Sequence, residues 1–118
     1  MSLPPSQLGA AYLNFIASHD GIGLRPIEGM LSKSEIKRLI VKMKNNGGEI
    51  SYRTNKDKEE TPYEINISLF DAMQETFSGN KDFHFDRFLC IHIIMLSLEG
   101  VPAFYIHSLF GYLYPQIF

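Results

Sequence analysis

The chain has 118 residues, of which 45% are hydrophobic and 20% charged, enough for one globular domain and too few for two. Eleven basic residues against thirteen acidic ones give a net charge of -2, so no basic excess indicates nucleic acid or an anionic membrane as a partner. The single cysteine, Cys90, excludes an internal disulfide and a cysteine-based metal cage and fits a protein of the reducing cytoplasm.

The sequence predicts neither a membrane span nor an export signal. Two apolar stretches in the second half of the chain are interrupted by His92, Glu99 and Pro102, so neither reaches the roughly 20 residues that cross a bilayer. The N-terminus lacks the basic start and apolar stretch of a signal peptide. We therefore predict a cytoplasmic protein in which residues 1–10 are a loose lead-in.

Residues 11–20 predict a buried strand that ends on two polar side chains. The apolar run at residues 13–17 has no clean alternation, as in a parallel strand covered on both faces, and Gly21 allows an immediate turn. Side chains at the carboxyl ends of parallel strands commonly carry the chemistry of α/β proteins. His19 and Asp20 are therefore the first site candidates. The alternative is that Asp20 only caps the turn and His19 is an ordinary strand-end residue.

Arg25 is the third candidate. It lies five residues beyond Asp20, close enough to face the same pocket, and the proline that follows biases it away from helix. The alternative is an arginine that is simply exposed to solvent.

The next segment predicts an amphipathic surface helix. Ser32 and Glu35 form a capping-box pattern, and apolar residues then recur at helical spacing. The basic residues, Lys42 among them, are assigned to the solvent side. Residues 45–48, Asn-Asn-Gly-Gly, end the helix because they tolerate left-handed backbone angles.

Two alternating stretches follow, at residues 49–53 and 63–69, with a charged segment at 54–61 between them. This pattern predicts an antiparallel hairpin with a polar loop. Residues 68–77 are predicted to contain a helical turn or two before the break at 78–80.

Residues 82–98 are apolar nearly all round and predict a helix that is packed on most sides, with Cys90 as a small core residue. Gly100 ends this helix, and residues 101–107 predict a second apolar strand. A strand, a long crossover, a helix and another strand then form a right-handed unit whose two strands are parallel.

Four stretches, taken in the same order, resemble the α-amylase superfamily in the form of sucrose phosphorylases and related glucosylglycerate-type phosphorylases. The motif Ser-His-Asp-Gly-Ile-Gly-Leu-Arg at residues 18–25 resembles the fourth motif of that superfamily. The four stretches are residues 14–29, 48–54, 61–67 and 100–111, and the resemblance covers residues 11–111.

The resemblance implies an α/β fold that is a fragment of a (β/α)8 TIM barrel, within a single partial catalytic domain. The two strands would be the seventh and eighth of the barrel, and the helix between them the seventh outer helix. The implied parts are the strand at 11–20, an inserted active-site loop region with a helix and a hairpin at 21–81, the helix and strand at 82–111, and a tail at 112–118.

The implied activity is retaining transfer of glucose from a glucoside to phosphate, with no cofactor and no metal. Asp20 would stabilise the oxocarbenium-like transition state, and His19 would bind the same sugar. Arg25 would contact phosphate or an anionic acceptor through its forked donors. His107 would end the last strand near the same face, in a core or supporting role.

This chain departs from the family at its two reactive acids. The nucleophile and the general acid would lie on the fourth and fifth strands, for which the sequence has no candidates. Glu28, Glu64 and Asp71 do not replace them, because retaining chemistry needs two carboxyl groups about 5 Å apart across the sugar. We therefore predict a fragment that is inactive alone.

Two alternatives belong to other classes. One is a non-enzymatic binding module that forms a homodimer or other self-association through an exposed strand edge. The other is metal-dependent hydrolysis by His19 and Asp20 with His84 or His92, which the spacing disfavours.

Overall fold

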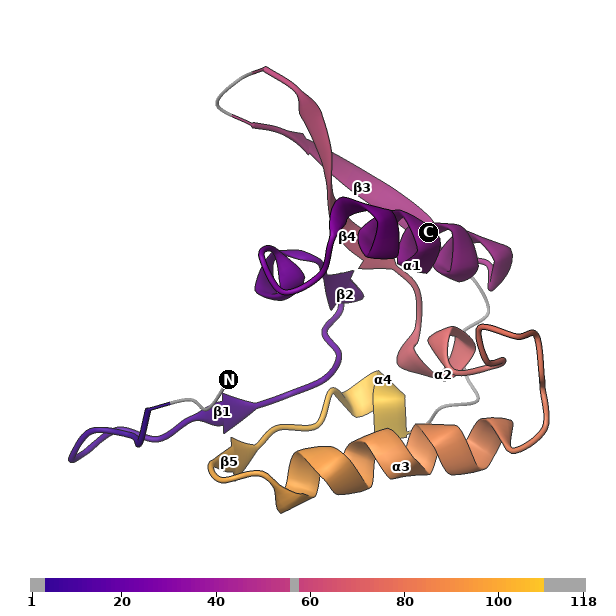
Figure 1. Ribbon diagram of the computed structural model, residues 1–118. Coiled ribbons are helices and arrows are strands. Elements are labelled where there is room, and N and C mark those ends of the chain that lie inside the picture. The colour runs from indigo at the N-terminus through magenta and orange to yellow at the C-terminus, as the bar shows by residue number, and fades with distance from the viewer. Residues whose placement is uncertain (1–3, 56–57, 110–118) are drawn as a thin grey trace.

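The computed structural model describes residues 4–55 and 58–109 and shows a mixed α/β fold with one parallel and one antiparallel sheet (Figure 1). The parallel sheet has two strands, and the antiparallel sheet has three in the order β2-β4-β3. The strands are β1 (Leu13–Asn14), β2 (Ile22–Gly23), β3 (Glu49–Thr54), β4 (Glu60–Asn66) and β5 (Val101–Pro102). The helices are a 3-10 turn η1 (Arg25–Ile27), α1 (Lys33–Asn45), α2 (Leu69–Ala72), α3 (His84–Ser97) and α4 (Ile106–Leu109).

The two ends of the described chain pair as parallel neighbours, as the sequence predicts. Leu13 lies opposite Val101, and the Val101 amide donates to the carbonyl of Tyr12 at 2.8 Å. The side-chain amide of Asn14 donates to the carbonyl of Glu99 at 3.0 Å, which fixes the end of α3 against β1. Gly100 makes this approach possible, because a Cβ there would lie 2.6 Å from the Tyr12 carbonyl oxygen.

Both parallel strands are shorter than predicted, and the second prediction was wrong beyond Pro102. The chain leaves the sheet there and residues Ile106–Leu109 form α4, so His107 lies on a helix instead of a strand end. Each strand has one neighbour in the described part of the chain, and nothing continues the ladder. The expected cover on both faces of the first strand is also absent, since Leu13 and Phe15 are 61% and 59% exposed.

The segment between the parallel strands forms α1 and the hairpin as predicted. Ser32 caps α1 in a complete capping box, which lowers the pKa of Glu35 through hydrogen bonds from the side chain and backbone of Ser32. The helix ends at Asn45, and Gly47 follows in a left-handed conformation with φ of 94°. Strands β3 and β4 pair antiparallel, with β4 starting at Glu60, inside the predicted loop.

The main hydrophobic core lies inside this inserted segment, between α1 and the antiparallel sheet. It continues onto α2, whose first turn is capped by the Ser68 hydroxyl. Partly buried apolar residues of β2, η1, α1 and β3 pack around it. The buried members of the core are Leu24, Met43, Ile65, Ile67 and Ala72.

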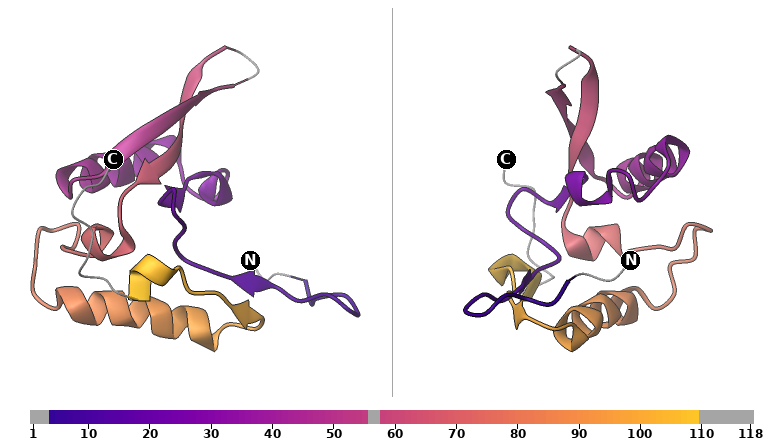
Figure 2. Two further views of the ribbon diagram at one scale, coloured as in Figure 1. Left: turned by 180° about the vertical axis from the view of Figure 1, so that it is seen from behind. Right: turned by 60° about the vertical axis from the view of Figure 1, so that its left-hand side comes forward.

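Helix α3 has nearly the predicted extent, but the prediction that it is packed on most sides was wrong. It buries the stripe of Phe88, His92 and Met95, with the Phe88 ring against His92 and the His92 ring stacked on Phe104. Cys90 is exposed and is no core residue, because it lies off that stripe. Figure 2 shows α3 along one margin of the molecule, with the other elements on its inner side.

No helix in residues 4–55 or 58–109 combines the length and apolar character needed to cross a membrane.

Candidate functional site

His19 and Asp20 form the tip of a tight turn that follows β1. The turn is closed by Ser18 and Gly21, whose backbones bond in both directions, from the Ser18 amide to the Gly21 carbonyl at 3.4 Å and from the Gly21 amide to the Ser18 carbonyl at 3.3 Å. The Ser18 hydroxyl oxygen accepts a hydrogen bond from the Asp20 backbone amide at 3.3 Å. The turn therefore presents the two site candidates side by side at its end.

The two side chains contact each other and remain open to solvent. His19 Nε2 lies 3.1 Å from Asp20 Oδ1, and the side chains are 79% and 52% exposed. In this arrangement the carboxylate keeps free lone pairs, and the imidazole of His19 can orient it. Such a pair can accept and donate hydrogen bonds to the neighbouring hydroxyls of a polyol or sugar.

Gly21 fastens this turn to the antiparallel sheet. Its φ is 102°, and a Cβ at this position would lie 2.2 Å from the carbonyl oxygen of Ile65 on β4. Ile22 then pairs antiparallel with Ile65, and the Leu24 amide donates a hydrogen bond to the Tyr63 carbonyl at 3.0 Å. The hairpin thus sets the direction in which the tip of the turn points.

Arg25 and His107 are not joined to this pair in the structure. Arg25 begins the 3-10 turn η1 and is exposed, and in the described chain no hydrogen bond or ion pair links it to Asp20. His107 lies on α4 with its ring 5.2 Å from that of Tyr105. The shared pocket expected for Arg25 and Asp20 is therefore still a prediction.

Two hollows among the described residues lie elsewhere. One, of about 660 Å³, lies between α1 and the loop at residues 77–79 and is bordered by Lys37, Arg38 and Lys42. The other, of about 240 Å³, lies between β1 and α3 and is mostly apolar. Neither is lined by His19, Asp20 or Arg25. In the same residues, no group of three histidine, cysteine, aspartate or glutamate side chains could hold a metal ion.

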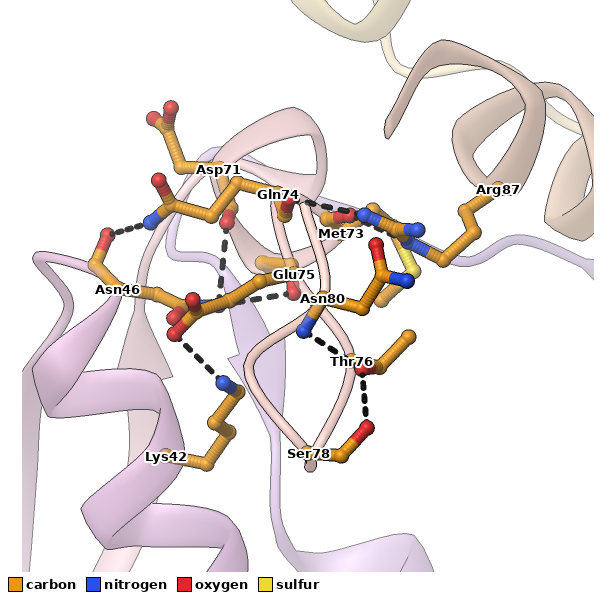
Figure 3. Close-up of polar contacts among 11 residues, drawn as sticks. Lys42, Asn46, Asp71, Met73, Gln74, Glu75, Thr76, Ser78, Asn80 and Arg87 are labelled. Carbon is orange, nitrogen blue, oxygen red and sulfur yellow. Dashed lines mark hydrogen bonds and ion pairs between the residues drawn. The ribbon is translucent and has the colours of Figure 1, made fainter. Parts of the chain in front are cut away.

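A polar network behind the core was missed by the sequence reading (Figure 3). Lys42, assigned to the solvent side of α1, is buried, and its ammonium donates to Glu75 Oε1 at 2.6 Å. That bond lowers the pKa of the Glu75 carboxyl. The assignment was wrong because the segment after α2 folds back over this face of the helix. Apolar periodicity gives no signal for such a contact.

Further bonds extend the network to both flanking helices. Asn46 donates from its side chain to the Ala72 carbonyl at 3.2 Å, and Gln74 donates to the Asn46 carbonyl at 2.8 Å. On the other side, the guanidinium of Arg87 on α3 donates to the carbonyls of Met73 and Gln74 at 2.9 and 2.8 Å. These contacts hold α1, the segment after α2 and α3 in one arrangement around the core.

Comparison with known proteins identifies relatives over nearly the whole chain. Glucosylglycerate phosphorylase of Escherichia coli (strain K12) is 40% identical over 111 residues, and that of Allomeiothermus silvanus is 40% identical over 112. Each match covers 94% of this chain but only 19% and 20% of the relative. Glucosylglycerate phosphorylase of Spirochaeta thermophila is 42% identical over 107 residues, 86% of this chain and 17% of the relative.

The chain thus spans about a fifth of the length of the curated relatives it matches. No protein-family model matches the sequence, and no solved structure matches it.

Proposed function

We propose that this chain is the part of a retaining glucoside phosphorylase that binds the glucosyl group during its transfer to phosphate. The three relatives named glucosylglycerate phosphorylase support this class of activity, because each is at least 40% identical over most of the length of this chain. The observation that carries the proposal is the exposed His19–Asp20 pair at the tip of a turn that starts four residues beyond the parallel strand β1.

In this proposal β1 and β5 are neighbouring strands of a (β/α)8 barrel of the α-amylase type, and α3 is the outer helix between them. The parallel register of Leu13 with Val101 supports the arrangement, since the two residues are far apart in sequence and joined through a helix. Residues 21–81 are then an insertion over the active-site face. The close approach of Gly21 to Ile65 of β4 holds the insertion against the turn that carries His19 and Asp20.

Asp20 is the proposed transition-state stabiliser. Its carboxylate accepts hydrogen bonds from sugar hydroxyls, and these strengthen as the anomeric carbon acquires oxocarbenium character. His19 donates to the same sugar and orients the carboxylate at 3.1 Å. Arg25 supplies a forked cation for phosphate or for an anionic acceptor, a role that its exposed position on η1 leaves available.

The nucleophile and the general acid are expected outside this chain. Among the acidic residues considered for these roles, Glu28 lies at the end of η1, Glu64 on β4, and Asp71 in the first turn of α2. None of the three lines either of the hollows described above, whereas a retaining pair faces one opening across the sugar. Turnover therefore needs carboxyl groups from another polypeptide segment.

A chimera tests the proposal. The matched 111 residues of the Escherichia coli relative are replaced by the corresponding residues of this chain, and release of glucose 1-phosphate from glucosylglycerate and phosphate is measured. We expect the chimera to be active and Asp20→Asn within it to lower kcat by about a hundredfold or more. Asp82→Asn, an exposed aspartate before α3, is the matched control and should leave kcat nearly unchanged.

The chain without the rest of the enzyme should form no glucose 1-phosphate. An inactive chimera that folds, or an Asp20→Asn chimera as active as the control, would refute the proposed role. Turnover by the chain alone would refute the placement of the reactive acids elsewhere.

A further inference from the structure

The hollow of about 660 Å³ between α1 and residues 77–79 has the size of a small-molecule site. Pockets that take organic ligands commonly measure about 300–1,000 Å³. One side of the hollow is formed by α1 and the other by the loop that follows α2. The α1 residues that line it lie on one face of the helix, because they are spaced three or four positions apart; they are Ser34, Lys37, Arg38, Val41, Lys42 and Asn45.

Two cations of this hollow have charged donors that the described part of the chain leaves unused. Lys37 and Arg38 are both exposed, and within that part neither side chain makes a hydrogen bond or an ion pair. No acidic residue is among the described residues that line the hollow. The carboxylate of Glu35, one turn before Arg38, accepts hydrogen bonds from the amide and hydroxyl of Ser32 at 2.7 Å each. The hollow is therefore a place of positive potential.

The wall formed by the loop is already held in place (Figure 3). The buried Lys42 donates to Glu75 at 2.6 Å, so these two charges compensate each other and tie the loop to α1. Farther along, the Thr76 amide donates to the Asn80 carbonyl and the Gly79 amide to the Thr76 carbonyl, both at 2.9 Å. Because the loop is closed on itself, a ligand meets a formed surface and little ordering opposes binding.

An aromatic ring lies beside the two free cations. Phe77 is 62% exposed, and the Arg38 guanidinium carbon lies 6.0 Å from the centre of its ring. Val41 on α1 is 51% exposed and adds a second apolar side chain to the lining. Two serines and an asparagine of the lining supply hydroxyl and amide groups. The hollow thus combines positive charge, a flat apolar surface and hydrogen-bonding groups.

We propose that this hollow binds a phosphate monoester of a ring compound, such as a phosphorylated sugar. The phosphate lies between Lys37 and Arg38, because a guanidinium pairs with phosphate through two parallel hydrogen bonds and an ammonium adds a second positive charge. The ring of the ligand lies against Phe77, since inorganic phosphate alone would leave most of the volume unfilled. The hollow shares no residue with the His19–Asp20 turn, so this inference does not rest on the proposed function.

An amide NMR titration of the full 118-residue chain tests the site. Four probes separate the parts of the ligand, namely glucose 6-phosphate, adenosine 5′-monophosphate, inorganic phosphate and glucose. We expect shifts centred on residues 37–41 and 77–79, with at least one ester bound about tenfold or more tightly than inorganic phosphate, and no binding of glucose. The ester that binds more tightly identifies the body of the ligand as a sugar or a nucleoside.

Substitutions separate the contribution of the charge from that of the ring. Arg38→Gln should weaken binding of the ester about tenfold or more, because the paired hydrogen bonds to phosphate are lost. Lys44→Gln is the matched control, since it removes one positive charge from an exposed position of the same helix that does not line the hollow. It should bind the ester as the unaltered chain does. Phe77→Leu should weaken binding of the ester and leave binding of inorganic phosphate unchanged.

Three results would overturn the phosphate-ester proposal. These are no shifts with either ester, equal affinity of Arg38→Gln and Lys44→Gln for the ester, and esters that bind no more tightly than inorganic phosphate. Shifts centred on residues 18–25 would also overturn it, because they would place the ester at the His19–Asp20 turn. The titration measures binding without turnover, so an inactive chimera leaves this proposal standing.

Discussion

Replacing Gly21 by alanine should detach the turn that carries His19 and Asp20 from β4. Gly21 has a φ of 102°, and an added Cβ would lie 2.2 Å from the Ile65 carbonyl oxygen and 3.1 Å from Asn66 Cα. Real Cβ atoms essentially never approach closer than 3.0 Å, so turn and strand must separate by several tenths of an ångström. Backbone atoms on both sides leave no flexible side chain to absorb the strain.

The size of the effect can be separated into two parts by a control. Alanine at a positive φ costs about 1–2 kcal/mol in backbone strain. Gly29 has φ of 79° and nothing within 4 Å of the added Cβ, so this backbone strain is the whole cost of Gly29→Ala. At Gly21 the broken contacts with β4 add about 1–2 kcal/mol, the value of one or two backbone hydrogen bonds. The change in unfolded-state entropy is the same for both and cancels in the comparison.

Urea unfolding followed by far-ultraviolet circular dichroism measures this difference. With a slope of about 1–2 kcal/mol per molar urea for a domain of this size, Gly21→Ala should unfold roughly 1 M earlier than Gly29→Ala. In the chimera, Gly21→Ala should also raise KM for the glucoside, because the site turn is displaced. Equal urea midpoints for the two variants would refute the close approach of the turn to β4.

Two further predictions concern the ends of the chain and the buried ion pair. Gly100→Ala should weaken the β1–β5 pairing, because its Cβ would lie 2.6 Å from the Tyr12 carbonyl oxygen. Hydrogen exchange at the Val101 and Ala103 amides, which donate to β1, should then become faster. Gly79→Ala, with open space at its Cβ, should leave that exchange unchanged. Glu75→Gln should lower stability at neutral pH. Since the Lys42 bond holds the folded pKa of Glu75 below its ordinary 4.5, this contribution is complete above that value and is lost as the pH falls through the folded pKa. A difference in unfolding free energy between Glu75→Gln and the unaltered chain that does not shrink in acid would contradict the Lys42–Glu75 ion pair.

The elements that the sequence predicts correctly are those specified by local chemistry. The capping box at Ser32 places the start of α1, and the left-handed Gly47 follows its end. Alternation identifies the hairpin, and α2 lies within residues 68–77, where a helical turn is predicted. The site turn is of the same kind, because a glycine after a polar pair allows the tight reversal that presents His19 and Asp20.

The errors arise where distant parts of the chain meet. Lys42 was assigned to solvent because helical periodicity cannot show that the segment carrying Glu75 covers that side of α1. The prediction at residues 101–107 failed because apolar content does not distinguish a strand without neighbours from the short helix α4. The position of Arg25 relative to the His19–Asp20 turn likewise depends on elements that its local sequence does not contain.

The distribution of buried residues links these observations to the proposed origin of the chain. Residues 21–81 close a core of their own around Leu24, Met43 and Ile65. The flanking parts differ, because β1 and α3 bury one side and expose apolar residues on the other. The apolar pattern of α3 is that of a helix enclosed by neighbours, and a free module would gain solubility by placing polar residues at Ile93 and Leu96. This pattern is typical of surfaces that other polypeptide covers, as the proposed barrel fragment requires.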